Sequence, residues 1–121
     1  MAKHNKTGEI GEIEARVFLQ NHGYSILQTN WRFGHYELDI IAEKENELII
    51  VEVKTRTSLE FEAPENAVGK DKIRRIVAAT DEYIQLYDID KSVRFDIISV
   101  YKGIDDCIID HIEDAFYPPI M

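Results

Sequence analysis

The sequence predicts a mixed α/β domain of the α+β type, with helices flanking a mixed central sheet. Two segments repeat apolar residues at helical spacing, and five short segments are rich in Ile, Val and aromatic residues, as strands are. Their order along the chain is one helix, three strands, a second helix and two more strands. A chain of 121 residues can bury a substantial core, so we expect residues 1–121 to form a single domain.

The first helix is expected from about Thr7, which can cap it, to Asn21. Ile10, Ile13 and Val17 recur at helical spacing within this segment. Gly23 follows directly, and a glycine just after the last periodic residue is typical of a helix end.

Three strands are predicted next, at residues 24–31, 36–42 and 48–54. The link between the second and third, residues 43–47, is short and polar, which favours an antiparallel hairpin. Such a hairpin brings Asp39 towards Glu52. Residues 55–64 show no sustained periodicity, so we expect a loop there.

A second, long amphipathic helix is predicted from apolar residues at helical spacing between Ile73 and Ile84, with Lys72, Arg74 and Arg75 on its early turns. Strands at residues 93–101 and 107–112 complete the sheet. We see no internal repeat, low-complexity run or linker, which agrees with one domain.

The formal net charge of −9 argues against a protein that coats nucleic acid, because phosphate binding depends on clustered Lys and Arg. The charge is unevenly distributed, however. The segment from Lys54 to Arg75 contains more basic than acidic residues, whereas the C-terminal segment is acidic.

Cysteine content and hydropathy indicate the cellular compartment of the protein. Cys107 is the one cysteine, and no Cys/His grouping has zinc-site spacing, which suits a reducing cytoplasm. The sequence contains no signal-like segment and no apolar run of membrane-spanning length. We therefore expect a cytoplasmic protein without a membrane anchor.

Asp39, Glu52 and Lys54 are the candidate catalytic residues. Alternate side chains of a strand share a face, so Glu52 and Lys54 project together, as do Glu37 and Asp39. Two carboxylates suit Mg²⁺, and a lysine beside them can orient water or neutralise charge on phosphorus. The pattern indicates metal-dependent phosphodiester hydrolysis.

From spacing alone, the same three residues fit a surface salt-bridge cluster equally well. Glu37 can bind metal or hold a neighbouring arginine such as Arg32, and we favour the second role. His35, alone in a turn, is weak evidence for a histidine base.

Three separated motifs carry a family resemblance: Gly11-Glu12-Ile13-Glu14-Ala15, Glu37-Leu38-Asp39-Ile40-Ile41-Ala42 and Val51-Glu52-Val53-Lys54-Thr55-Arg56. Through them, nearly the whole chain resembles the YraN-like family of bacterial proteins, related to the PD-(D/E)XK nuclease superfamily and its Holliday-junction resolvase branch. Tyr36 stands where that family usually has glycine, a change that affects the entry to the second strand.

The resemblance implies a restriction-endonuclease-like αβββαβ core and a metal-dependent endonuclease. In such a site Asp39 and Glu52 bind Mg²⁺ or Mn²⁺, the carbonyl of Val53 adds a ligand, and Lys54 assists the attacking water. Glu12 resembles an accessory acidic residue of the resolvase branch, although Glu12 near a helix N-terminus also simply favours the helix dipole.

The resemblance further implies DNA as the partner, including branched DNA, and is compatible with a homodimer. We assign nucleic-acid contacts to Arg32, Arg56 and Lys72. Two alternatives stay open: a non-catalytic nucleic-acid- or protein-binding module on the same scaffold, and an acidic protein-interaction domain without a nucleic-acid role.

Overall fold

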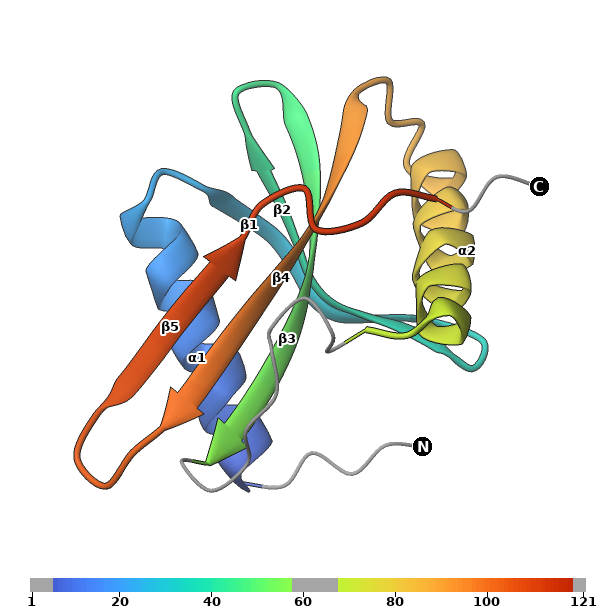
Figure 1. The fold of residues 1–121 in the computed structure, drawn as a ribbon. Helices are drawn as coiled ribbons and strands as arrows, with labels where there is room; N and C mark the ends of the chain where they lie inside the picture. The colour runs from blue at the N-terminus through green and yellow to red at the C-terminus, as the bar shows by residue number, and fades with distance from the viewer. Residues whose placement is uncertain (1–5, 58–67, 119–121) are drawn as a thin grey trace.

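A computed structural model describes residues 6–57 and 68–118 of the chain (Figure 1). Seven elements follow one another in the predicted order. They are α1 (Lys6–Asn21), β1 (Ser25–Phe33), β2 (Tyr36–Lys44), β3 (Glu47–Thr57), α2 (Lys70–Leu86), β4 (Ser92–Lys102) and β5 (Cys107–Ile112).

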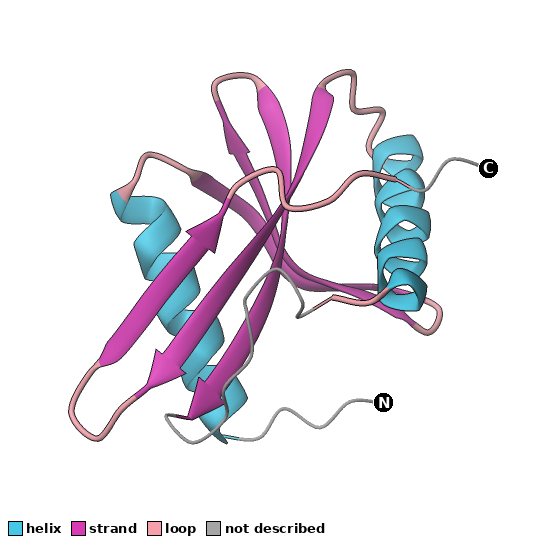
Figure 2. Cartoon of the chain, viewed as in Figure 1, coloured by secondary structure: helices cyan, strands magenta, loops and turns pink. Residues whose placement is uncertain are grey.

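The five strands form one mixed sheet in the order β1-β2-β3-β4-β5 (Figure 2). Neighbouring strands are antiparallel except β3 and β4, which are parallel. The parallel pair requires a crossover, and α2 lies within that connection, as is usual for parallel strands. The predicted α+β class with a mixed central sheet is confirmed.

The two helices cover opposite faces of the sheet. Ala15 and Leu19 of α1 pack in one buried apolar cluster, while Ile76 and Ala79 of α2 pack in the other. The residues of β3 alternate between these clusters, which explains its continuous apolar run. Among the described residues, neither helix combines the length and the apolar character needed to cross a membrane.

Positive backbone φ angles mark two chain reversals expected from the sequence. Gly23, two residues after the end of α1, has φ +87°, a conformation that glycine adopts without a steric penalty. Between β2 and β3, Glu45 and Asn46 have φ 52° and 64°, as a two-residue type I′ hairpin turn requires. The hairpin predicted between residues 36–42 and 48–54 is therefore confirmed.

β3 is longer than predicted. Residues 55–57, expected to begin a loop, continue the strand because each pairs in parallel with β4, up to Thr57 beside Lys102. This pairing is long-range, so local periodicity does not predict it. The remainder of the predicted loop, residues 58–64, lies outside the described residues. The second predicted helix is present, and α2 begins at Lys70, three residues before the first apolar residue of its pattern, Ile73.

A buried polar cluster joins β4, β5 and the segment after β5. The carboxylate of Asp96 is fully buried and accepts hydrogen bonds from Arg94 Nε at 2.9 Å and from the backbone N–H of Asp114 at 3.0 Å. The Nε2 atom of His111 lies 2.7 Å from the same carboxylate. Burial alone would raise the pKa of Asp96, but these hydrogen bonds outweigh it and lower the pKa.

The side-chain alternation of β2 breaks at Asp39. Leu38 and Ile41 pack in the α2-side cluster, whereas Ile40 and Ala42 pack in the α1-side cluster. The paired positions of β2 and β3 begin beyond this break, with Ile40 opposite Val51, and continue to the hairpin turn. Figure 1 shows the β1–β2 turn swinging towards α2 while the end of β3 runs the other way. The two strands therefore separate at Asp39.

Candidate functional site

Asp39 lies at the point where β2 and β3 separate. Its Oδ2 atom accepts a hydrogen bond of 2.9 Å from the backbone N–H of Val53. At Val53, β3 no longer pairs with β2. The carboxylate of Asp39 therefore takes the place of a strand partner and accepts the Val53 N–H hydrogen bond. The hydrogen bond holds Asp39 beside the Glu52-Val53-Lys54 triplet, as the predicted hairpin requires.

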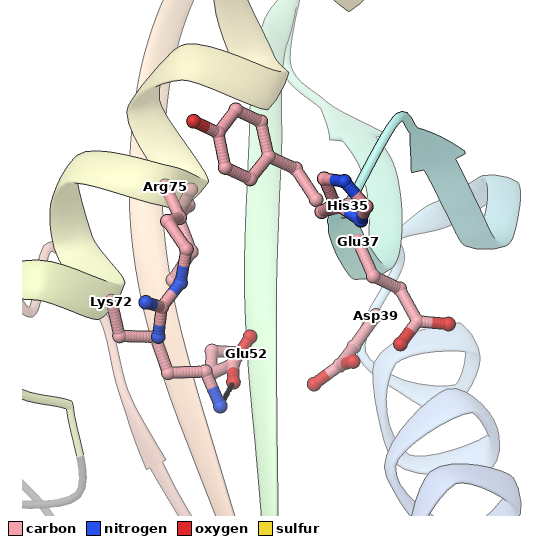
Figure 3. A pocket seen from close by; sticks show the side chains of 8 residues that line it. His35, Glu37, Asp39, Glu52, Lys72 and Arg75 are labelled. Carbon is pink, nitrogen blue, oxygen red and sulfur yellow. Dashed lines mark ion pairs between the residues drawn. The ribbon is translucent and has the colours of Figure 1, made fainter. Parts of the chain in front are cut away.

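Glu52 is buried, with its side chain 6% exposed, and it forms an ion pair with Lys72 of α2. It follows Val51 of the α1-side cluster, and this alternation directs it towards α2. In Figure 3, Asp39 approaches Glu52 from one side and Lys72 from the other. Two carboxylates and one ammonium therefore meet between β2, β3 and α2.

A pocket of about 250 Å³ opens at this meeting point, large enough for a hydrated cation and a phosphate group. Residues of both signs line it: His35, Tyr36, Glu37, Asp39, Glu52, Lys72, Arg75 and Ile76. The acidic groups come from the strands and the cations Lys72 and Arg75 from α2. In Figure 3, Glu37 and Asp39 lie across the pocket from these cations, whereas Glu52 contacts Lys72 directly.

The environment of Asp39 changes its titration. Burial, followed by the charge of Glu52, raises the pKa of Asp39 to about 8, against the lowering effects of the Val53 hydrogen bond and Lys72. Burial by itself would lower the pKa of Lys72, but Glu52 more than offsets it and the pKa rises. A carboxyl group with a strongly raised pKa in a pocket is typical of a functional site.

Lys54 shares the sheet face of Glu52 but does not line the pocket. Thr55 faces α1, because a Cβ on Gly11 of that helix would overlap the Thr55 hydroxyl. Side chains alternate, so the half-buried Lys54 faces the α2 side beyond Glu52. Its catalytic role stays a prediction, as do those of Asp39 and Glu52.

The backbone N–H and C=O of Val53 point into the gap between the separated strands β2 and β3. In an extended strand the N–H and C=O of one residue point to the same neighbouring strand. Since the Val53 N–H reaches Asp39, its carbonyl also faces that edge. The orientation suits the metal-ligand role predicted for this carbonyl.

Three further predicted site residues, Glu12, Arg32 and Arg56, do not line the pocket. Glu12 is half-buried on α1 and does not line the pocket. Arg32 lies 3.5 Å from Glu37 in an ion pair, the contact favoured for Glu37, although Glu37 also lines the pocket. Arg56 is only 3% exposed, so its predicted contact with nucleic acid requires neighbouring groups to move. Lys72 alone of the three predicted nucleic-acid contacts lines the pocket.

The donor set resembles a magnesium site more than a zinc site. Within residues 6–57 and 68–118, no three His, Cys, Asp or Glu side chains are grouped to hold a metal. Mg²⁺ commonly uses one or two carboxylates and completes its shell with water and substrate phosphate. Asp39, Glu52 and the Val53 carbonyl fit that pattern.

Sequence reasoning missed the direct pairing of Lys72 with Glu52 and the presence of Arg75 and Tyr36 in the pocket. Helical spacing in the sequence partly indicates the position of Lys72. Lys72 lies one turn before the buried Ile76, which places it at the edge of the buried face of α2 rather than on the exposed face.

The fold is similar to that of a Holliday junction resolvase. A Holliday junction resolvase from Archaeoglobus fulgidus, named Hjc, matches the structure with a TM-score of 0.51, covering 88% of this chain and 77% of that one. The two sequences are 13% identical, so the likeness concerns the fold.

The chain belongs to the family described as "Uncharacterised protein family UPF0102", whose model matches residues 11–100. A UPF0102 protein from Parabacteroides distasonis is 57% identical over 119 residues, covering 98% of each chain. One from Bacteroides thetaiotaomicron is 55% identical over 121 residues, covering the whole of both. The family resemblance found in the sequence is confirmed.

Proposed function

We propose that the protein is a Mg²⁺- or Mn²⁺-dependent endonuclease that hydrolyses DNA phosphodiester bonds, including those of branched DNA. The observation that supports this most directly is the meeting of Asp39, Glu52 and Lys72 in one pocket where β2 and β3 separate. Carboxylates bind a cation there, and cationic side chains opposite them suit a phosphate.

In this proposal Asp39 and Glu52 hold the divalent cation, and the Val53 carbonyl completes the protein's share of the ligands. The bound cation supplies Lewis-acid stabilisation of charge on phosphorus and lowers the pKa of water. Lys54, on the same face as Glu52, orients the attacking water. Arg75 faces the phosphate from α2, where its fixed positive charge stabilises the transition state.

The raised pKa of Asp39 supports a cation at this position. Burial, and after it the negative charge of Glu52, favour a proton on Asp39 in the metal-free protein. A divalent cation bound by both carboxylates offsets these two effects. Hence binding should release a proton near pH 7, which calorimetry in two buffers of different ionisation enthalpy detects.

Calorimetric titration with Mn²⁺ tests the site without any assumption about the substrate. Wild type should bind Mn²⁺ saturably, and a folded Asp39→Asn/Glu52→Gln variant should lose that binding. A Glu45→Gln variant in the exposed hairpin turn is the matched control and should bind as wild type does. Equal binding by wild type and the double variant would place the metal elsewhere.

Cleavage then requires a panel of labelled DNAs: a four-way junction, a flap, a duplex and a single strand. Mn²⁺-dependent products that disappear with Asp39→Asn support the enzyme, and preference for the junction supports branched DNA. A homodimer acting on both strands would be detected as a doubled mass by sedimentation.

A second candidate is a non-catalytic module on the same scaffold. Both carboxylates already have partners within the protein, Val53 for Asp39 and Lys72 for Glu52, and each contact holds elements together. Metal-independent, salt-sensitive DNA binding that survives Asp39→Asn would favour this candidate. Absence of DNA binding at low salt would instead favour a protein-interaction domain.

A further inference from the structure

The ion pair between Lys72 and Glu52 occupies the carboxylate that the proposed metal site requires. Glu52 has a side chain 6% exposed, whereas the side chain of Lys72 is 42% exposed and comes from the first turn of α2. The buried partner is therefore fixed on a central strand. The cation that neutralises it has a long, flexible side chain with an open path to solvent.

Lys72 differs from the other cations at the start of α2. Lys70 is exposed, and Arg74 forms an ion pair with Asp71 at 3.0 Å on the outer surface. Lys72 and Arg75, three residues apart, line the pocket instead. Residues at this spacing share a helix face, so the two cations face the pocket together.

The contact is not needed to attach α2 to the sheet. Ile76, Ala79 and Tyr83 of α2 are each at most 4% exposed and pack against the strands. Tyr83 also packs edge-on against Trp31 of β1, with ring centroids 5.3 Å apart. Apolar burial of this extent anchors the helix without the contribution of a single ion pair.

We propose that Lys72 is a displaceable cation: it neutralises Glu52 in the metal-free protein, leaves Glu52 when the carboxylate binds a divalent cation, and then binds a DNA phosphate together with Arg75. This inference rests on the proposed function, since it assigns a regulatory role within the same site. Lys72 thereby neutralises the buried charge of Glu52 before metal binds.

Displacement makes metal and DNA binding cooperative. While Lys72 is paired with Glu52, its charge is unavailable to a phosphate. Once the pair opens, the charge becomes available, so metal should strengthen DNA binding. By thermodynamic linkage, DNA should strengthen metal binding by the same factor.

The first test measures Mn²⁺ affinity by calorimetry for wild type, Lys72→Gln and Lys72→Arg, with Lys70→Gln as the control from the same helix turn. Removing the competing ammonium should tighten Mn²⁺ binding about five- to tenfold in Lys72→Gln. Lys72→Arg keeps a cation on Glu52 and should gain less than about twofold. Lys70→Gln should match wild type. Thermal melts establish that each variant is folded.

The second test measures DNA affinity by fluorescence anisotropy with a labelled single-stranded DNA, in a Lys54→Ala background that prevents cleavage. Mn²⁺ should tighten DNA binding at least about fivefold with Lys72 present, an increment corresponding to one ion pair, and lose most of that effect with Lys72→Gln.

The outcomes separate this inference from the proposed function. Equal or weaker Mn²⁺ binding by Lys72→Gln relative to wild type overturns the displaceable cation and leaves the metal site intact. Absence of Mn²⁺ binding by every variant, with and without DNA, overturns both. Tighter Mn²⁺ binding together with loss of the Mn²⁺ effect on DNA supports the inference.

Discussion

The backbone N–H of Val53 donates a hydrogen bond of 2.9 Å to Asp39 across the gap that opens between β2 and β3. Asp39 therefore has two roles in one position: it completes the edge of β3 and it faces Glu52 in the pocket. A change at Asp39 affects both, so variants must preserve the hydrogen-bond acceptor if the second role is to be measured alone.

Asp39→Asn keeps an acceptor for Val53 and removes the titrating group. The pKa of Asp39 rises from its ordinary value of 3.8 to about 8 in the folded protein. The folded state therefore binds a proton that the unfolded chain has released, and stability falls as pH rises from 3.8 to about 8. The slope is at most about 1.4 kcal/mol per pH unit.

Urea unfolding at several pH values, without metal, checks this prediction. Asp39→Asn should flatten the decline and be more stable than wild type at pH 8. Asp88→Asn, at an exposed position after α2, should leave the profile unchanged. Parallel profiles for wild type and Asp39→Asn would show that Asp39 does not retain its proton.

Lys54→Ala should leave the fold intact and reduce DNA cleavage by about 100-fold or more, the usual cost of removing one group that stabilises a transition state. Lys54 is half-buried on an end of β3 that β4 continues to pair, so the strand does not depend on its side chain. Lys70→Ala is the control. Cleavage by folded Lys54→Ala at the wild-type rate would remove Lys54 from the mechanism.

Gly11→Ala should destabilise the protein by about 1 to 3 kcal/mol, as overpacking typically does. The added Cβ would overlap the hydroxyl of Thr55 on β3, so α1 must shift away from the sheet. Thr55→Ala in the same chain should recover part of the loss. Gly69→Ala, where a Cβ meets nothing within 4 Å, is the control in denaturant unfolding. Additive effects at positions 11 and 55 would contradict the contact.

Asp96→Asn should cost about 1.5 to 3 kcal/mol, because Arg94 and His111 lose their contacts with a buried carboxylate, while Glu113, at 3.4 Å, still pairs with Arg94. The folded pKa of Asp96 lies below its unfolded value. Its stabilisation is thus present above the unfolded pKa and is lost as pH falls through the folded pKa. Asp110→Asn, exposed on β5, is the control for unfolding between neutral and acid pH. Equal acid sensitivity of all three proteins would contradict the role of Asp96.

The sequence predicted the elements because periodicity is a local property. Residues 107–112 match β5 at both ends, and Asn21 matches the end of α1. The extension of β3 to Thr57 was missed, because its pairing with β4 joins residues about forty-five positions apart, as Thr57 with Lys102. Likewise, a hairpin was predictable, whereas the break in alternation at Asp39 depends on how both helices pack.

The candidate site was predictable where motif and hairpin coincide, at Asp39 and Glu52, both of which line the pocket. The pairing of Glu52 with Lys72 was not predictable, because Lys72 belongs to α2 and the position of that helix on the sheet depends on tertiary packing. Asp96 offered an unused signal: a lone carboxylate inside the apolar run from Phe95 to Val100 must be paired when buried.

The isolated hydrogen bond at Val53 also makes this amide a natural spectroscopic probe. On the β2-facing edge of β3 beyond Val51, strand pairing no longer protects backbone protons from exchange with solvent. Val53 is held there by a side chain rather than by a neighbouring strand. Its nuclear magnetic resonance shift and its deuterium exchange rate therefore follow the occupancy of one carboxylate, without a label and without a substrate.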